Sequence, residues 1–178
     1  MPEAAVTQDT AVPHLIRNGQ LQADTWRVHA PAEPDATPDA TPADEPGWIV
    51  PLATWKAAQT ALRARANPVG VLLPPDANLA DLAGDGDTLD TTGIALIAID
   101  FPAYTDGRGY SLAQLLRKRY GYAGELRAVG DVMIDTIHYQ ARVGFDSFLV
   151  KPGHDPQKAL AAFKTFSVHY QKTYLVPA

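Results

Sequence analysis

The chain has 178 residues, of which 46% are hydrophobic, so a single domain with a proper core can form. Its formal net charge of −5 argues against a nucleic-acid binder that neutralises phosphates. It contains no cysteine, which excludes disulfides, a thiol nucleophile and thiolate-held zinc or iron–sulfur sites. No apolar run approaches the roughly 20 residues that a membrane span requires, and the first residues lack a signal-peptide pattern. We therefore expect a cytoplasmic protein that binds neither membranes nor nucleic acids.

The N-terminal part combines a predicted hairpin with a segment of unusual composition. Asn18-Gly19 is a two-residue turn signal between apolar residues, so residues 14–26 are predicted to form a β-hairpin. Residues 30–47 contain five prolines and five acidic residues but no basic or aromatic residue. Such a segment cannot bury enough apolar surface to offset its ordering entropy, so a flexible acidic loop is predicted. A lure for a basic partner and a tolerated insertion are both open interpretations of this loop.

Beyond this loop, helical and strand patterns alternate. Residues 93–100, "GIALIAID", are apolar on both faces, which is typical of a central parallel strand. The alternation implies right-handed crossovers between parallel strands, with helices on the faces of the sheet. We predict a single α/β domain over residues 1–178, in which the N-terminal β-hairpin precedes a mainly parallel sheet with flanking helices. A partial (β/α) barrel is the alternative arrangement, because four main strands are too few for a closed eight-stranded barrel.

Polar residues at N-cap positions predict where four of the helices begin. Ser111 followed by Gln114 forms a capping box, and Asp155 precedes a proline at the favoured first helical position. The predicted helices are capped by Thr54 before residues 55–66, by Ser111 up to about Gly121, by Asp131 before residues 132–142, and by Asp155 up to about Gln171.

Candidate catalytic residues follow from position, because ligands in such folds bind beyond the carboxyl ends of the strands. Asp131 and His154 follow successive predicted strands and are the candidate acid or base. For Asp131, a simple helix cap is the structural alternative. The five histidines show no metal-ligand spacing, and Asp131 with Asp135 is more often a cap beside a solvated face than a cation site. No metal site is therefore predicted.

An anion-binding loop is predicted where residues 106–111 run into a helix N-terminus. Free backbone N–H groups there favour an anion, and Arg108 adds a planar bidentate donor. In the alternative interpretation Asp106-Gly107 forms a turn, Ser111 caps the helix, and a carboxylate holds Arg108. The candidate anion-binding residues are Arg108, Gly109, Tyr110, Ser111 and Lys151.

A structural ion pair is predicted for Arg127, which lies within a mostly buried strand and needs a partner there. We expect that partner to be Glu125, Asp131 or Asp106, and we regard Asp106, Arg127 and Glu125 as residues that support the structure or the site. The loop at residues 106–111 lacks the third glycine of a dinucleotide fingerprint and the Lys-Ser/Thr of a phosphate loop. The cofactor, if one is used, therefore stays unknown.

Residues 101–150, "FPAYTDGRGYSLAQLLRKRYGYAGELRAVGDVMIDTIHYQARVGFDSFLV", resemble the signature block of the bacterial domain of unknown function 934 family. Relatives in that family are typically encoded beside assimilatory sulfite reductase and are often labelled oxidoreductases of sulfite reduction. Many relatives have a cysteine where this chain has Val143, so a mechanism built on that thiol cannot operate here. The matching residues are Phe101, Pro102, Asp106, Gly107, Arg108, Gly109, Tyr110, Ser111, Leu116, Arg117, Gly124, Glu125, Leu126, Arg127, Gly130, Asp131, Arg142, Gly144 and Phe145.

The resemblance implies an accessory protein of assimilatory sulfate and sulfite reduction. Such a protein would act with or for sulfite reductase, by binding or assembly rather than by its own redox chemistry, because any electron transfer would need a borrowed flavin or nicotinamide. The alternative is an enzyme for a small anionic metabolite at the carboxyl ends of the strands. In that enzyme Arg108 and Lys151 would hold the anion, and Asp131 or His154 would move a proton. A homodimer whose loops serve only structure is a third interpretation.

Overall fold

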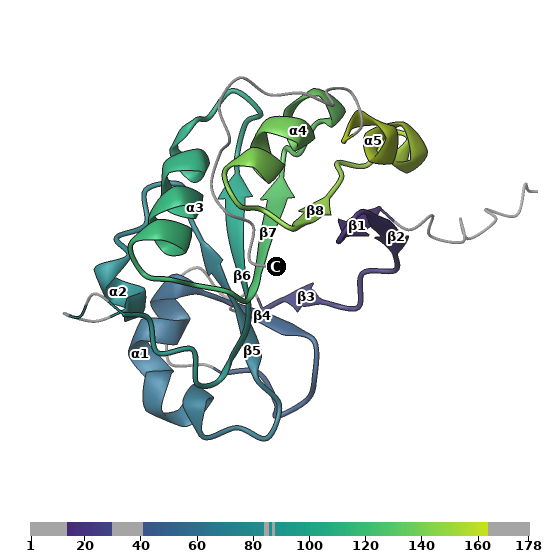
Figure 1. Ribbon diagram of the computed structural model, residues 1–178. Helices are drawn as coiled ribbons and strands as arrows, with labels where there is room; N and C mark the ends of the chain where they lie inside the picture. The colour runs from purple at the N-terminus through teal and green to yellow at the C-terminus, as the bar shows by residue number, and fades with distance from the viewer. Residues whose placement is uncertain (1–13, 30–40, 84–85, 87, 164–178) are drawn as a thin grey trace, which may run out of the picture.

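The computed structural model describes residues 14–29, 41–83, 86 and 88–163, and these form one curled sheet with flanking helices (Figure 1). The strands are β1 (Leu15–Arg17), β2 (Gln20–Gln22), β3 (Arg27–Val28), β4 (Trp48–Pro51), β5 (Val69–Leu73), β6 (Ile94–Phe101), β7 (Glu125–Gly130) and β8 (Ser147–Leu149). The helices are α1 (Leu52–Arg63), α2 (Ala80–Ala83), α3 (Arg108–Lys118), α4 (Ile134–Arg142) and α5 (Pro156–Ala162).

The sheet has eight strands in the order β2-β1-β8-β7-β6-β5-β4-β3. From β3 to β8 each strand pairs in parallel with the next strand of the chain, so every crossover steps to the adjacent position in one direction. Right-handed crossovers of this kind place the helices on one face, and the sheet curls away from them into a half-barrel (Figure 1). The predicted α/β class and mainly parallel sheet are confirmed, and the curl matches the partial (β/α) barrel.

The N-terminal hairpin is confirmed, and its strands β2 and β1 form one outer edge of the sheet, next to β8. Arg17 pairs with Gln20, which leaves Asn18 and Gly19 as a two-residue turn with φ of 50° and 71°. Both values lie in the left-handed region that this turn type requires. β1 also pairs antiparallel with β8, a long-range contact that the sequence did not predict.

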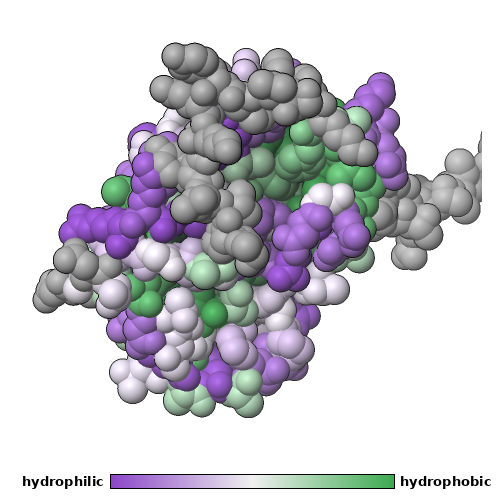
Figure 2. Space-filling model, in the orientation of Figure 1, coloured by the Kyte–Doolittle hydropathy of each residue, from purple (hydrophilic) through white to green (hydrophobic). Residues whose placement is uncertain are grey.

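The core lies mainly between the sheet and its helices. In β6, Ile97, Ile99 and Phe101 face this large core, whereas Leu96 and Ala98 face a smaller cluster on the other side of the sheet. This alternation explains why the strand is apolar on both faces. Figure 2 shows hydrophobic side chains gathered in a hollow between α4, α5 and the β8–β1 end of the sheet.

Two of the predicted helix starts are wrong, because α1 and α3 each begin several residues before the predicted position. α1 starts at Leu52 with Pro51 in the N-cap position, and Thr54 is a buried residue inside the helix. α3 starts at Arg108 with Gly107 as its N-cap, so Ser111 lies within the helix rather than capping it. Neither helix has a side-chain cap hydrogen bond.

The start of α4 is also corrected, whereas that of α5 is confirmed. α4 begins at Ile134 after Met133, and Asp131 does not cap it because its carboxylate has other partners, described below. At α5, Asp155 is the N-cap and accepts a hydrogen bond from the Gln157 N–H at 2.9 Å. The predicted end of this helix near residue 171 lies outside the described residues.

The end of the acidic segment is anchored to the turn that follows α1. Asp44 accepts hydrogen bonds from the backbone N–H groups of Ala66 and Asn67, both at 3.0 Å. Arg65 donates to the carbonyl of Pro42 at 2.7 Å. These contacts attach residues 42–44 to the turn after α1, while residues 30–40 of the predicted acidic loop lie outside the described part. Within the described part of the chain, no helix is long and apolar enough to cross a membrane.

Candidate functional site

The carboxyl ends of β4 to β8 lie along one edge of the half-barrel, because these strands are parallel neighbours. The loops that leave this edge carry most of the polar residues predicted for a site. The edge holds an Asp106–Arg108 pair, an Asp131–Lys151 pair with His154, and a pocket that the sequence did not predict.

The Asp106–Arg108 pair occupies the start of α3. Asp106 Oδ1 accepts the backbone N–H of Arg108 at 3.0 Å, and its Oδ2 accepts from Arg108 Nη2 at 2.7 Å. The hydrogen bonds from the Arg108 side chain and backbone lower the pKa of Asp106 below its ordinary value. The carboxylate of Asp106 therefore takes the place at the helix N-terminus that was predicted for an anion.

The other residues of the predicted anion loop pack or face solvent. Gly109 is buried, and a Cβ there would lie 2.7 Å from Cζ of Phe101, so the glycine lets α3 approach β6. Tyr110 packs edge-on against Phe101 with ring centroids 5.7 Å apart, and its hydroxyl is hydrogen-bonded to Thr136. Ser111 is exposed on α3. None of these three residues, nor Arg108, lines the pocket described below.

Asp131 is held between the loops that follow β6 and β8. Its Oδ1 accepts from Lys151 Nζ at 2.6 Å, and its Oδ2 accepts the backbone N–H of Tyr104 at 3.0 Å. The Lys151 hydrogen bond, the Tyr104 N–H and the nearby His154 lower the pKa of Asp131. The structure thus brings together Asp131, Lys151 and His154, as the topology predicted, but Asp131 is a paired anion rather than a free base.

We expect the pKa of Asp131 to lie below its ordinary value near 3.8, and we expect this pKa to rise in the Lys151→Met variant. The ionised form is favoured in the folded state, so the stabilisation is present above the unfolded pKa and is lost as the pH falls through the lowered folded pKa. Side-chain carboxyl chemical shifts followed by NMR against pH would measure both pKa values. Lys158→Met removes an equal charge from α5 and is the control. An Asp131 titration that is identical in wild type and Lys151→Met would contradict the assignment.

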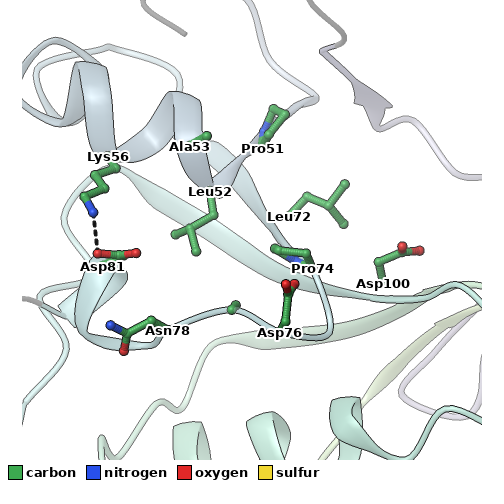
Figure 3. Close-up of a pocket in the computed structure, with 11 residues that line it drawn as sticks. Pro51, Leu52, Ala53, Lys56, Leu72, Pro74, Asp76, Asn78, Asp81 and Asp100 are labelled. Atoms are coloured by element: carbon green, nitrogen blue, oxygen red, sulfur yellow. Dashed lines mark hydrogen bonds and ion pairs between the residues drawn. The ribbon is translucent and has the colours of Figure 1, made fainter.

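A pocket of about 570 Å³ lies between α1, α2 and the ends of β4, β5 and β6 (Figure 3). Leu52, Leu72 and Pro74 form apolar walls, and Asp76 and Asp100 lie on one side of the opening. A volume of several hundred Å³ at the ends of parallel strands is typical of small-molecule sites in such folds. The only signal for this pocket in the sequence is that Asp76 and Asp100 lie after or at the carboxyl end of an apolar strand pattern.

Charges are distributed unevenly around this pocket. Lys56 Nζ forms an ion pair with Asp81 Oδ1 at 2.6 Å, whereas no described residue forms an ion pair with Asp76 or Asp100. Burial, and to a lesser extent the charge of Asp106, raises the pKa of Asp100. The backbone of Gly130 lies close to Asp100, because a Cβ on Gly130 would lie 2.5 Å from the Asp100 Oδ1.

Arg127 forms a buried ion cluster on the face of β7 away from the helices. Its side chain is 1% exposed and pairs with Glu125 at 2.7 Å and with Asp24 at 2.9 Å. Arg17 adds a contact to Glu125 at 3.1 Å. The predicted Glu125 partner is confirmed, and the second partner is Asp24 rather than Asp131 or Asp106. The cluster connects β7 to the N-terminal hairpin and its following loop.

The structure shows no multidentate metal site in the described residues, where no group of three or more His, Asp or Glu side chains could hold an ion.

Residues 70–177 match a family model described as "Bacterial protein of unknown function (DUF934)". This match covers more than half of the chain and includes Asp76, Asp100 and the two ion pairs of the edge. No curated protein and no solved structure matches the chain.

Proposed function

Since the chain belongs to the bacterial DUF934 family of unknown function, we propose that it is a cytoplasmic accessory protein of assimilatory sulfite reduction. It acts with or for sulfite reductase by binding or assembly, not by redox chemistry of its own. The resemblance of residues 101–150 to proteins encoded beside that reductase supports the pathway. One feature of the structure supports binding over catalysis.

That feature is the state of the candidate cations. Arg108, Lys151 and Arg127 are each in contact with a carboxylate, at 2.7, 2.6 and 2.7 Å. An anion such as sulfite would have to displace these carboxylates before it could bind. Each cation thus already has an anionic partner within the fold, which favours a structural role, even though the exposed pairs of Arg108 and Lys151 add little to stability.

An enzyme for a small anion at the same edge has weaker support. The pocket provides a cavity for a small molecule, but the unpaired carboxylates Asp76 and Asp100 would repel an anion that approaches from their side. Asp131 and His154 lie in a different group of contacts, next to Lys151. The anion-handling residues and the cavity are therefore not arranged as one site.

Growth on defined sulfur sources tests the proposal. A strain without this protein is expected to grow poorly on sulfate and on sulfite, and normally on sulfide and on cysteine, because only the first two sources require sulfite reductase. Arg108→Met and Lys151→Met variants are expected to restore growth as wild type does. The purified protein should also bind the sulfite reductase holoenzyme in sedimentation velocity.

Two outcomes would contradict the proposal. Equal growth of the deletion strain on all four sulfur sources would remove the link to sulfite reduction. A deletion phenotype that folded Arg108→Met or Lys151→Met fails to restore would favour the small-anion enzyme.

A further inference from the structure

The pocket at the ends of β4, β5 and β6 has no role in the proposed accessory function, and its walls combine apolar and charged surfaces (Figure 3). Leu52 is 7% exposed and belongs to the large core, while Leu72 packs with the smaller cluster across the sheet. The cavity is thus set into well-packed structure, and about 570 Å³ is enough for a small metabolite.

One side of the pocket is negative. Asp76 lies in the loop after β5, and Asp100 lies near the carboxyl end of β6, where it also interacts with the charge of Asp106. Arg108 binds Asp106 and interacts with Asp76 at longer range, so its charge is shared between these two carboxylates. An ammonium group bound on this side would offset the negative charge of Asp76 and Asp100.

The other side is formed by the first turn of α1 and is electropositive. α1 has twelve residues and begins after Pro51, with no side-chain cap and no acidic residue in its first turn. Its first backbone N–H groups have no partner within the helix, and Ala53 of this turn lines the pocket. Lys56, one turn further along, also lines it and is balanced by Asp81. A carboxylate fits this side, where helix N–H groups and dipole favour an anion.

We propose that this pocket binds a small zwitterion of amino-acid type, with an apolar body. Its ammonium group lies on the side of Asp76 and Asp100, its carboxylate lies at the first turn of α1, and its apolar part contacts Leu52, Leu72 and Pro74. A simple anion would meet the unpaired carboxylates, and a simple cation would leave the helix N-terminus unused. The inference does not rest on the proposed role in sulfite reduction.

Titrations with three matched probes test the proposal. The probes are L-norleucine, its amide, which carries only the ammonium group, and its N-acetyl derivative, which carries only the carboxylate. Binding to the full chain is followed by NMR shifts of backbone amides, below neutral pH so that the amines are charged. L-Norleucine is expected to bind at least about tenfold more tightly than either analogue, with shifts at Asp76, Asp100 and Ala53.

Variants locate the two charges. Asp76→Asn and Asp100→Asn are each expected to weaken binding of L-norleucine by about tenfold. Neither variant is expected to weaken binding of the anionic N-acetyl probe, because these carboxylates repel it. Asp90→Asn is the control, because it makes the same change in charge before the start of β6, at the opposite end of the parallel strands from the pocket. It is expected to have no effect on binding. Asp76 is exposed, so this variant is expected to fold even if Asp100→Asn does not.

Each contrary result overturns a stated part of the proposal. An amide that binds as tightly as L-norleucine would exclude the carboxylate end, and an N-acetyl probe that does so would exclude the ammonium end. Binding that both aspartate variants leave intact would place the site elsewhere. No binding of any probe at millimolar concentration would exclude this class of ligand.

Discussion

Arg117→Met is expected to lower the free energy of unfolding by about 3–5 kcal/mol. The Arg117 side chain is 5% exposed and joins the end of α3 to the loops around β7. It donates to the carbonyls of Gly144 at 3.0 Å, Tyr122 at 2.6 Å and Gly124 at 2.8 Å, and to Asp146 Oδ2 at 3.0 Å. Methionine fills similar space but satisfies none of these acceptors.

The loss should depend on pH through Asp146. Burial raises the pKa of Asp146, while hydrogen bonding from Leu126 and the charge of Arg117 oppose that rise. Without Arg117 the pKa of Asp146 should rise further, so the folded variant binds a proton more tightly than its unfolded chain does. Its stability then falls as the pH rises through the window between the unfolded and folded pKa values. Arg117→Met is therefore expected to be less destabilising in acid than at neutral pH.

Urea denaturation of wild type and variant at two pH values measures both effects. Arg108→Met is the matched control, because Arg108 also pairs with one aspartate but its side chain is 58% exposed. This variant is expected to lose no more than about 1 kcal/mol. Equal losses in Arg108→Met and Arg117→Met would show that burial and the three carbonyl contacts do not determine the effect.

The elements that the sequence predicted correctly depend on local signals. Asn18-Gly19 fixes the hairpin turn, because few other residue pairs adopt two consecutive positive φ values. Asp155-Pro156 starts α5 through a cap hydrogen bond within three residues. Residues 93–100 are apolar on both faces, and this local pattern is enough to indicate a central strand. In these cases the tertiary structure agrees with the local preference.

The capping predictions failed where another contact competed, either between distant residues or within the same loop. Asp131 has the residue type of an N-cap, but Lys151 and the Tyr104 N–H compete for its carboxylate. Ser111 loses its predicted capping position for a local reason, because α3 starts four residues earlier, where Asp106 accepts the Arg108 N–H. Propensity is a weak guide where tertiary partners are available.

The site was predictable only as an edge of the sheet. Alternating strands and helices indicated that Asp131, Lys151 and His154 would meet, since each follows a parallel strand. The pocket was not predictable in this way, because its walls come from α1, from the loop after β5 and from Asp100 at the end of β6. Which neighbouring loops leave a cavity depends on how α1 and α2 pack, and a sequence pattern does not record that packing.

The ion cluster around Arg127 combines a predictable and an unpredictable contact. Glu125 lies two residues away on the same face of β7, so the strand period brings the two side chains together. Asp24 is 103 residues distant and reaches Arg127 only because the N-terminal hairpin pairs with β8. The Arg127–Asp24 contact can therefore form only when the N-terminal hairpin is packed against the parallel part of the sheet.

Arg127→Met is accordingly expected to destabilise the protein by about 3–5 kcal/mol, because it leaves Glu125, which is 6% exposed, with a single cation. That remaining partner, Arg17, is 45% exposed and lies 3.1 Å from Glu125, so it compensates only in part. The second variant, Arg127→Met with Glu125→Gln, removes the buried charge and should recover about 1–3 kcal/mol of the loss. Urea denaturation of the two single variants and the double variant gives the coupling energy. Losses that simply add would mean that Arg127 and Glu125 do not stabilise the fold as an ion pair.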